Sequence, residues 1–271
     1  MGHAPDTLHR SLPSAPLRDF VREYRLTETA PGRSSVRPVV GGPHPRLILQ
    51  LGDPLDAFEY RTGRVRRLAP ALVVGPQSRR MADLHFHGRH VSFQVAFDAG
   101  GLYRLFGFPS RQLVDTAVAA SEVIGPAAAR LYEALRHAGN PDQMVDAVEG
   151  LLLAQLPLAR PAHAVEAAAR RLQDERGLTS LRQLAAGCGL SQRQIGRKFC
   201  ERIGLSPKRF ARVVRLSHAL TLREQRPSLT WTDISQEAGF FDQAHLVKEF
   251  KSLLRLSPSA FARLDGLPAI Q

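Results

Sequence analysis

A chain of 271 residues with 44% hydrophobic residues and a formal net charge of +12 has room for two domains with their own cores, and it favours a polyanionic partner, either nucleic acid or an acidic membrane face. No run approaches the ~18 apolar residues of a membrane span, and the first thirty residues carry charges without an apolar signal-peptide segment. Two cysteines do not make a disulfide framework or a zinc knuckle, so we expect a protein of the reducing cytoplasm.

Residues 36–98 consist of short β-prone runs separated by turn residues. The sequence predicts strands at 47–51, 72–74 and 91–97, because each run is rich in Val, Leu, Ile or Phe and is bounded by turn residues. Several short strands at this spacing are typical of a small antiparallel barrel or sandwich.

The hydrophobic period changes to that of a helix between residues 126 and 156. Two apolar stripes follow each other: Ala129, Leu131, Tyr132 and Leu135, then Met144, Val145, Val148, Leu151, Leu152 and Leu156. Gly139-Asn140-Pro141 separates them, which predicts an αα-hairpin at 126–156. Because two stripes exceed what one small β-domain needs to cover, we expect the hairpin to support self-association or coupling between domains.

A linker flanked by Pro157 and Pro161 follows the hairpin, and the sequence beyond it is helical in pattern. We therefore expect an α+β protein of two domains. Residues 1–157 form a β-rich, sensor-like domain with its helical hairpin, and residues 158–271 form an all-α domain.

An internal duplication occupies the last hundred residues. Residues 191–212 align with residues 242–263 at an offset of 51, and upstream of the turn the offset is 50, because one extra residue has entered the second turn. In each copy a capping residue, Ser191 or Asp242, is followed by an apolar residue four positions later and a phenylalanine eight positions later. This spacing places the two apolar side chains on one buried helical face.

Further signals in both copies mark where helices start and end. Gly189 and Gly239 suit a tight turn, and the Ser-Pro pairs at 206–207 and 257–258 begin another helix with serine as its cap. A helical repeat used only for packing is the simpler interpretation of a single copy. Two copies with the same signals instead predict two helix-turn-helix units, joined by one long helix at about 206–223.

Basic charge is concentrated in the same region. Residues 163–264 hold 18 Lys and Arg against 9 Asp and Glu, and within 191–226 ten basic residues face only Glu201 and Glu224. A solvated helix face usually mixes the two signs, so this excess favours a surface that follows DNA phosphates.

Two segments resemble the double helix-turn-helix domain of AraC/XylS-type transcription regulators. They are LRQLAAGCGLSQRQIGRKFCERIGLSPKRF and DISQEAGFFDQAHLVKEFKSLLRLSPSAF, and the second contains a Gly-Phe-x-Asp-Gln-x-His run at 239–245. The resemblance covers residues 163–264. It implies a bacterial regulator that is not an enzyme, needs no cofactor, and carries a variable sensory domain at its N-terminus.

The partners implied by this resemblance and by the charge are double-stranded DNA and a small-molecule effector. RNA polymerase is a further partner if the protein activates transcription, and a homodimer is expected from the hairpin. The resemblance also implies that both recognition helices enter successive major grooves, roughly 34 Å apart.

The residues that we expect to contact DNA lie on the outer faces of the two recognition helices. They are Gln192, Arg193, Gly196, Arg197, Lys198, Gln243, Ala244, Val247, Lys248 and Lys251. Arg193 and Arg197 can each present a guanidinium fork to guanine, whereas Gly196 between them offers no side chain.

The second recognition helix is less polar, and we expect it to discriminate less between bases. Gln243 can pair with adenine, Ala244 or Val247 can touch a thymine methyl group, and Lys248 is equally suited to a phosphate. His245 is expected to pack against the turn or to bond it rather than to read a base.

The duplication is imperfect at Arg255, which stands where the first copy has Gly204. A glycine there commonly closes a helix in the left-handed conformation, and an arginine at positive φ costs on the order of 1 kcal/mol relative to glycine. Either the second helix ends differently, or the strain is tolerated because the guanidinium reaches a DNA phosphate.

Three histidines, His85, His87 and His90, suggest a metal site in the β-rich part, with His44 or Glu59 as a further ligand. We favour a polar edge with three exposed histidines and no metal, because no glutamate stands at the usual spacing of metal-binding cupins.

Enzymes with a DNA-binding module are the alternative class of function, either a cupin-like metalloenzyme or a DNA-repair methyltransferase. Repair by alkyl transfer needs an activated cysteine thiolate, yet Cys188 and Cys200 both lie inside the DNA-binding region. A nucleoid-type structural binder would leave the N-terminal domain without a purpose. We therefore expect a sequence-specific regulator.

Overall fold

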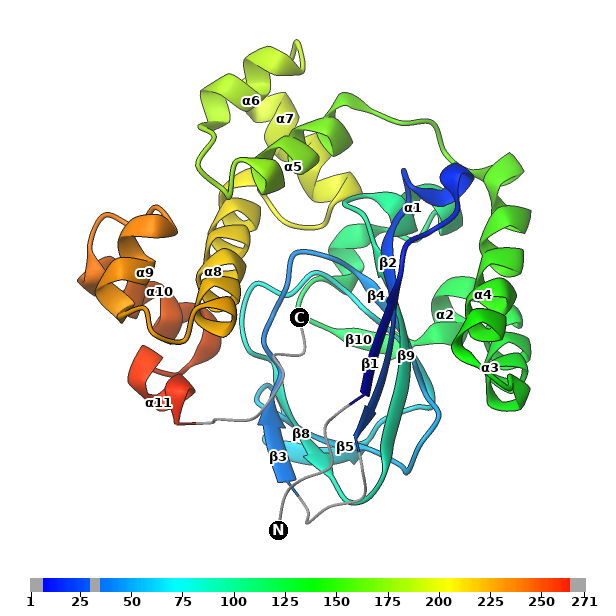
Figure 1. The fold of residues 1–271 in the computed structure, drawn as a ribbon. Coiled ribbons are helices and arrows are strands. Elements are labelled where there is room, and N and C mark those ends of the chain that lie inside the picture. Colours follow the sequence, from blue (N-terminus) through cyan, green and yellow to red (C-terminus); the bar gives the residue numbers. More distant parts are fainter. Residues whose placement is uncertain (1–6, 30–34, 264–271) are drawn as a thin grey trace.

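The structure, a computed structural model, describes residues 7–29 and 35–263, so the outer ends of both expected domains lie outside the described residues. A β-rich region is followed by a helical region that packs against one side of it (Figure 1). This arrangement confirms the predicted fold class.

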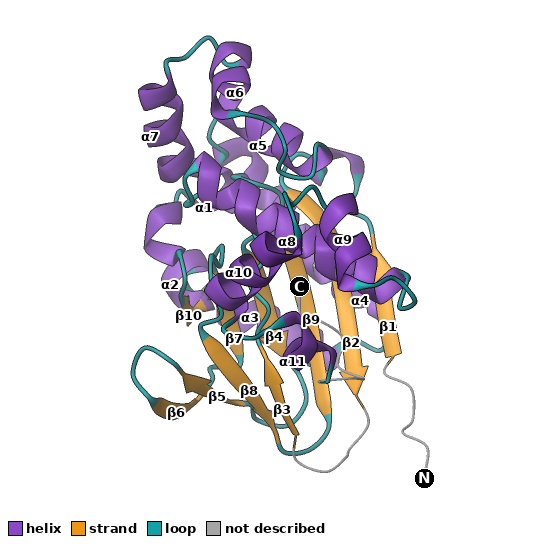
Figure 2. Ribbon diagram, turned by 90° about the vertical axis from the view of Figure 1, so that its left-hand side faces the viewer, coloured by secondary structure: helices purple, strands orange, loops and turns teal. Residues whose placement is uncertain are grey.

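Two antiparallel sheets form the β-rich region (Figure 2). The larger sheet has the order β1 (Thr7–Ser11), β2 (Val21–Thr29), β9 (His90–Phe97), β4 (Arg46–Gln50), β7 (Ala71–Val74) and β10 (Ala117–Ala119). The smaller sheet has the order β3 (Ser35–Pro38), β8 (Ala82–Phe86), β5 (Asp56–Glu59) and β6 (Arg64–Arg67). The three predicted strands are confirmed as β4, β7 and β9, which lie next to one another inside the larger sheet.

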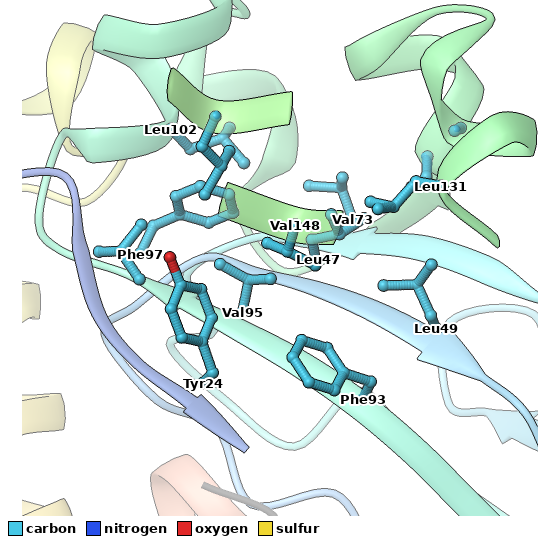
Figure 3. Packing of buried hydrophobic residues seen from close by; sticks show 14 of the residues in the cluster. Tyr24, Leu47, Leu49, Val73, Phe93, Val95, Phe97, Leu102, Leu131 and Val148 are labelled. Carbon is cyan, nitrogen blue, oxygen red and sulfur yellow. The ribbon is translucent and has the colours of Figure 1, made fainter. Parts of the chain in front are cut away.

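The side chains of β4 point alternately to the two faces of the larger sheet. Leu47 and Leu49 are buried against the helices that cover the outer face, as Figure 3 shows for the surrounding core. Arg46, Ile48 and Gln50 point to the opposite face, toward the smaller sheet, because side chains alternate along a strand.

Short helices connect the strands and cover the outer face of the larger sheet. They are η1 (Ala15–Leu17), α1 (Gly101–Phe106), η2 (Ser110–Leu113), α2 (Ala120–Ile124), α3 (Ala127–His137), α4 (Pro141–Gln155) and η3 (Leu156–Leu158). The predicted hairpin is confirmed as α3 and α4, with Asn140 capping α4 by accepting the N–H of Gln143 at 2.9 Å.

The hairpin packs both of its stripes onto its own sheet. Leu131, Leu135, Val148 and Leu152 are buried in one cluster with the strands. The first stripe was placed wrongly at one position, because Ala129 is exposed and its neighbour Ala128 is buried. The larger sheet has a broad apolar outer face, which both stripes cover. The expectation that the two stripes exceed what the β-domain needs to cover is therefore wrong.

The helical region contains α5 (Ala164–Asp174), α6 (Leu181–Gly187), α7 (Gln192–Arg202), α8 (Pro207–Gln225), α9 (Trp231–Glu237), α10 (Gln243–Leu254) and α11 (Pro258–Ala262). Two helix-turn-helix units, α6–α7 and α9–α10, are joined by α8, as the duplication predicts. Each unit has its own apolar cluster, to which the β-rich region adds Ala99 in the first and Val40 in the second. No helix of the described residues is long and apolar enough to cross a membrane.

Candidate nucleic-acid interface and cavity between the sheets

The turn and the helix cap of the first unit, α6–α7, form at the residues that the sequence predicts. Gly189 has φ 62° in the turn, and the Ser191 hydroxyl caps α7 by accepting the N–H of Gln194 at 3.2 Å. Ile195 and Phe199 are completely buried, which turns the opposite side of α7 outward.

The outer face of α7 carries most of the polar side chains expected there. Gln192, Arg193 and Arg197 are exposed and Gly196 is half-buried. Lys198 lies further round the helix, where its ammonium pairs with Glu201 at 3.5 Å. The structure therefore brings the two arginines to one accessible surface.

Arg197 occupies the edge of this face that lies nearest the β-rich region. Together with Tyr103, Arg111 and Arg160 it lines a hollow between α7 and the segment after α1. Arg197 thus stands at the border between the exposed face of α7 and the contact with the β-rich region.

The second unit repeats the design with a different turn. Asp242 caps α10 by accepting the N–H of His245 at 2.7 Å, and Leu246 and Phe250 are completely buried. His245 Nδ1 accepts the N–H of Phe241 at 3.3 Å, which confirms that this histidine bonds the turn.

The outward residues of α10 differ in how exposed they are to solvent. Ala244, Lys248 and Lys251 are exposed and Val247 is half-buried. The exposed Gln243 accepts a hydrogen bond from the Thr232 hydroxyl of α9 at 3.1 Å, so its amide is already oriented by the preceding helix.

Phe241 is a surface residue that sequence reasoning missed. It precedes the cap of α10 and is 91% exposed, although large apolar side chains rarely stand so free. The available signal was the extra residue in the second turn, because the change of offset from 51 to 50 falls there.

Arg255 ends α10 in the left-handed conformation, with φ 56° and ψ 23°, so of the two alternatives left open by the sequence the helix does not end differently from the first copy. Its guanidinium carbon lies 4.8 Å from the centre of the Tyr60 ring, on the hairpin between β5 and β6. The contact seen in the structure is therefore a cation–π contact with the β-rich region.

An ion pair connects the second unit to the connecting helix α8. The Arg212 guanidinium of α8 donates to Glu249 of α10 at 2.8 Å and to the Ser252 hydroxyl at 3.1 Å. Glu249 is thereby neutralised on the second recognition helix, and the position of α10 is tied to the connecting helix.

Both recognition helices are also held by the β-rich region at their C-terminal ends. The Ser110 hydroxyl donates to the carbonyl of Arg202 on α7 at 2.8 Å, and the N–H of Arg80 donates to the carbonyl of Leu253 on α10 at 2.6 Å. Arg202 forms a buried ion pair with Glu166 of α5 at 2.5 Å. The N-terminal ends of α7 and α10, which carry the exposed polar residues, remain accessible.

A cavity of about 140 Å³ lies between the two sheets. Most of its wall is apolar, and the side chains that line it from β4 and β7 are Arg46, Ile48, Gln50, Leu72 and Val74. Burial, together with the nearby Arg25, lowers the pKa of Arg46 to about 9.

One loop that lines the cavity also contacts the helical region. Val40 packs with the core of the second unit, and the His44 ring meets the edge of Phe210 on α8 with ring centres 6.5 Å apart. Burial holds the pKa of His44 well below its usual range, so its ring is neutral at physiological pH. His44 Nδ1 then donates to the Phe97 carbonyl at 3.1 Å, which leaves Nε2 to accept from Gln173 of α5.

The histidines considered as metal ligands are not arranged alike. His90 is buried, which corrects the expectation of three exposed histidines, while His85 is half-buried and His87 is exposed. His87 Nε2 lies 3.3 Å from Asp56. Across the described part of the chain, no three His, Cys, Asp or Glu side chains gather in a way that could hold a metal ion.

The two cysteines lack the environment of a reactive thiolate. Burial raises the pKa of both Cys188 and Cys200, although Arg209 partly offsets the effect at Cys200. Alkyl transfer requires a thiolate near neutral pH, so these thiols do not support the repair alternative.

Two family models match the chain. One, described as a helix-turn-helix domain, matches residues 184–264, and the other, described as a domain of unknown function (DUF6597), matches residues 9–119.

Curated relatives match over the C-terminal region. An uncharacterized HTH-type transcriptional regulator of Haemophilus influenzae is 34% identical over 96 residues, which are 35% of this chain and 32% of that protein. The HTH-type transcriptional regulator MtrA of Neisseria gonorrhoeae is 25% identical over 107 residues, which are 40% of this chain and 34% of that protein. The match therefore spans about a third of the length of these relatives.

The fold resembles a solved structure over nearly its whole length. ToxT of Vibrio cholerae O395 aligns with a TM-score of 0.51 at 10% identity, over 92% of this chain and 100% of that one. A second structure of ToxT from Vibrio cholerae aligns with a TM-score of 0.52 at 11% identity, over 89% of this chain and 97% of that one. Residues 184–264 thus match a helix-turn-helix domain and resemble the corresponding region of HTH-type transcriptional regulators, and the fold of the chain resembles that of ToxT.

Proposed function

We propose that the protein is a sequence-specific DNA-binding transcription regulator that responds to a small-molecule effector, and that it is not an enzyme. The observation that carries this proposal is the pair of helix-turn-helix units whose recognition helices are anchored at their C-terminal ends and accessible at their N-terminal ends. Recognition helices of this motif contact base edges through their N-terminal residues.

In this proposal α7 supplies most of the base reading. Arg193 and Arg197 are one helical turn apart on the exposed face, and each can form two parallel hydrogen bonds to one guanine. Gln192 and Lys198 serve the flanking phosphates or bases. The half-buried Gly196 leaves a gap between the arginines where the helix can approach the groove closely.

On α10 the roles divide between bases and backbone. Gln243 is oriented by Thr232, which prepares its amide for adenine, and Ala244 with Val247 offers an apolar surface to a thymine methyl group. Lys248 and Lys251 are exposed and suit phosphates. We expect weaker base discrimination from α10 than from α7.

The cavity between the sheets is the proposed effector site. Its wall shares Val40 and His44 with the contact to the helical region, so a molecule in the cavity lies beside side chains that touch both units. An effector that shifts this loop would change the position of the units relative to each other, and so the affinity for two successive grooves.

Two further partners belong to the proposal. RNA polymerase is the expected partner if the protein activates transcription. A homodimer is supported by exposed leucines: Leu153 on α4 is 38% exposed, and Leu158 just beyond it is 75% exposed. These side chains lie outside the stripes that the hairpin packs onto its own sheet.

The deciding experiment is selection of bound sequences from random duplex DNA by the intact protein. We expect enrichment of one motif, with two blocks spaced by about one helical turn. The double variant Arg193→Ala, Arg197→Ala should lose the motif, whereas Arg64→Ala, an exposed arginine on β6, should retain it. Enrichment of no motif by the unmodified protein would refute sequence-specific binding.

A further inference from the structure

Three arginines surround the hollow between α7 and the β-rich region. Arg197 comes from α7, Arg111 from η2, and Arg160 from the linker that follows η3. All three are exposed, and none of them forms an ion pair with a carboxylate among the residues that the structure describes. The hollow therefore gathers three positive charges that are accessible to a ligand.

The hollow keeps this excess of positive charge because its wall holds little negative charge. Of the described residues that line it, only Glu201 carries a carboxylate, and this carboxylate lies 3.5 Å from the ammonium of Lys198. A concave surface of one sign attracts ligands of the opposite sign. The volume of about 520 Å³ is many times the ~30 Å³ that one water molecule occupies, so an anion as large as a phosphate group fits.

Arg160 is held in place by α1, although it lies in the linker between the two regions. Its backbone N–H donates to the carbonyl of Arg104 at 2.8 Å, and the Arg104 guanidinium donates to the carbonyl of Arg160 at 3.2 Å. The Arg160 guanidinium donates to the Tyr103 hydroxyl at 3.1 Å and lies 4.8 Å from the centre of that ring. Gly107 leaves room for it, because a Cβ there would stand 2.8 Å from the guanidinium. An arginine that is positioned in advance loses less conformational entropy when it binds an anion.

Arg111 is brought to α7 by the fixed position of η2. The Ser110 hydroxyl donates to the carbonyl of Arg202 on α7 at 2.8 Å, and Leu113 at the end of η2 is completely buried. The Arg111 guanidinium itself forms no hydrogen bond or ion pair with the residues that the structure describes. All of its donors are therefore available to a ligand in the hollow.

A second hollow on the same border lacks this excess of charge. It lies between the β-rich region, α8 and α10, where Arg79, Arg209 and Arg212 line it. Arg79 lies 3.5 Å from Asp115, and Arg212 pairs with Glu249 at 2.8 Å. Two of its three arginines are thus neutralised, which makes the hollow beside α7 the stronger anion site.

The hollow beside α7 begins where the exposed face of that helix ends. Arg193, Arg197 and Glu201 follow one another at intervals of four, so they lie on one face, and the last two already line the hollow. The 11-residue helix is about 16 Å long, whereas the major groove is about 12 Å wide and about 8.5 Å deep. When the N-terminal end of α7 lies in the groove, its C-terminal end therefore lies beside the phosphates that border the groove.

We propose that this hollow binds a backbone phosphate of the DNA that α7 reads, and that Arg111 and Arg160 donate to its oxygens. The β-rich region is then part of the DNA interface, and it contributes a contact that carries no sequence information. This inference rests on the proposed DNA-binding function and adds a site outside the two helix-turn-helix units.

The donors suit a phosphodiester. The planar fork of arginine donates two parallel hydrogen bonds to two phosphate oxygens, and a phosphodiester carries one negative charge between them. Two guanidinium groups exceed that charge, so the contact remains attractive with Glu201 nearby.

The first test measures the salt dependence of DNA affinity for the intact protein, on the selected motif and on an unrelated duplex of the same length. Arg111→Ala should shrink the log–log salt slope by about one unit and weaken binding at least roughly threefold at low salt. Both duplexes should lose affinity by the same factor, because a phosphate contact does not depend on base sequence. The melting temperature should stay unchanged, and Arg111→Lys should retain most of the slope.

Arg79→Ala is the matched control, because it removes an exposed arginine of the β-rich region whose charge is already paired with Asp115. It should leave the salt slope unchanged. Adding Arg160→Ala to Arg111→Ala should shrink the slope by about one further unit.

The second test locates the phosphate with neutral methylphosphonate groups placed one at a time along the duplex. At one position the substitution should weaken binding by the unmodified protein and have no effect on the double variant Arg111→Ala, Arg160→Ala. The two changes remove the two sides of the same contact, so their effects should not add.

An unchanged salt slope in the double variant, or a scan without such a position, would overturn the proposal. An equal loss in Arg79→Ala would also overturn it, since any surface charge would then have the same effect. Isothermal titration that shows Arg111-dependent binding of inorganic phosphate, with DNA affinity unchanged in Arg111→Ala, would assign the hollow to a free phosphate instead. Failure to select any motif would reject the proposed sequence-specific function separately, because the salt slope is also measured on an unrelated duplex.

Discussion

Replacing Arg255 with glycine should leave the stability of the intact protein nearly unchanged, because two contributions of similar size oppose each other. Glycine relieves the left-handed backbone at φ 56°, which should stabilise the protein by about 1 kcal/mol. It also removes the guanidinium that lies 4.8 Å from the Tyr60 ring centre, and an exposed cation–π contact contributes about 0.5–1 kcal/mol.

A double-mutant cycle separates the two contributions. Tyr60→Leu removes the ring together with its hydrogen bond to Asp83, and the cycle cancels what this change does by itself. In the Tyr60→Leu background, Arg255→Gly should raise the free energy of unfolding by about 1 kcal/mol, which corresponds to roughly 2–4 °C in melting temperature. The coupling between the two positions should be about 0.5–1 kcal/mol.

Urea denaturation of the four proteins measures these quantities, and a salt titration of DNA binding tests the phosphate alternative. Because the guanidinium lies over Tyr60, Arg255→Gly should leave the salt dependence of DNA affinity unchanged. Destabilisation by Arg255→Gly in the Tyr60→Leu background would refute the strain argument. A salt slope smaller by about one unit would show that Arg255 contacts a phosphate.

The fragment 158–271 should fold alone and bind DNA with a log–log salt slope of about −5 to −7, as 6–8 phosphate contacts require; an unfolded fragment or a slope near zero would reject the domain assignment. Arg197→Ala should relax base preference in one half of the selected motif, whereas Lys248→Ala should weaken all sequences alike; equal, sequence-independent losses would mean that Arg197 contacts only the backbone. Phe241→Ala should change the free energy of unfolding by less than about 0.5 kcal/mol yet reduce DNA affinity several-fold, and unchanged affinity would leave the exposed ring without a role in DNA binding. Sedimentation of the intact protein should show a dimer that Leu153→Glu dissociates, and a monomer at high concentration would exclude self-association.

The sequence by itself determined the helical region almost completely. Caps, buried positions and turn glycines recur at fixed spacing in two copies, and each of these signals acts within a few residues. The alignment of Arg255 with Gly204 offered a positive φ as one of two alternatives, and the structure has it. The exposure of most candidate DNA contacts follows from helical periodicity once Ile195 and Phe199 are known to be buried.

Tertiary structure alone decided how the β-rich region is assembled and which of its side chains line the cavity or contact the helical region. The sequence predicted β4, β7 and β9, which carry long apolar runs, but the remaining strands are short or polar and depend on pairing with distant strands. No local pattern showed that Arg46 lines a cavity, because that cavity depends on a second sheet formed by β3, β8, β5 and β6. Nor could spacing place Arg255 over Tyr60, since these residues are almost two hundred positions apart and meet only when the two regions pack.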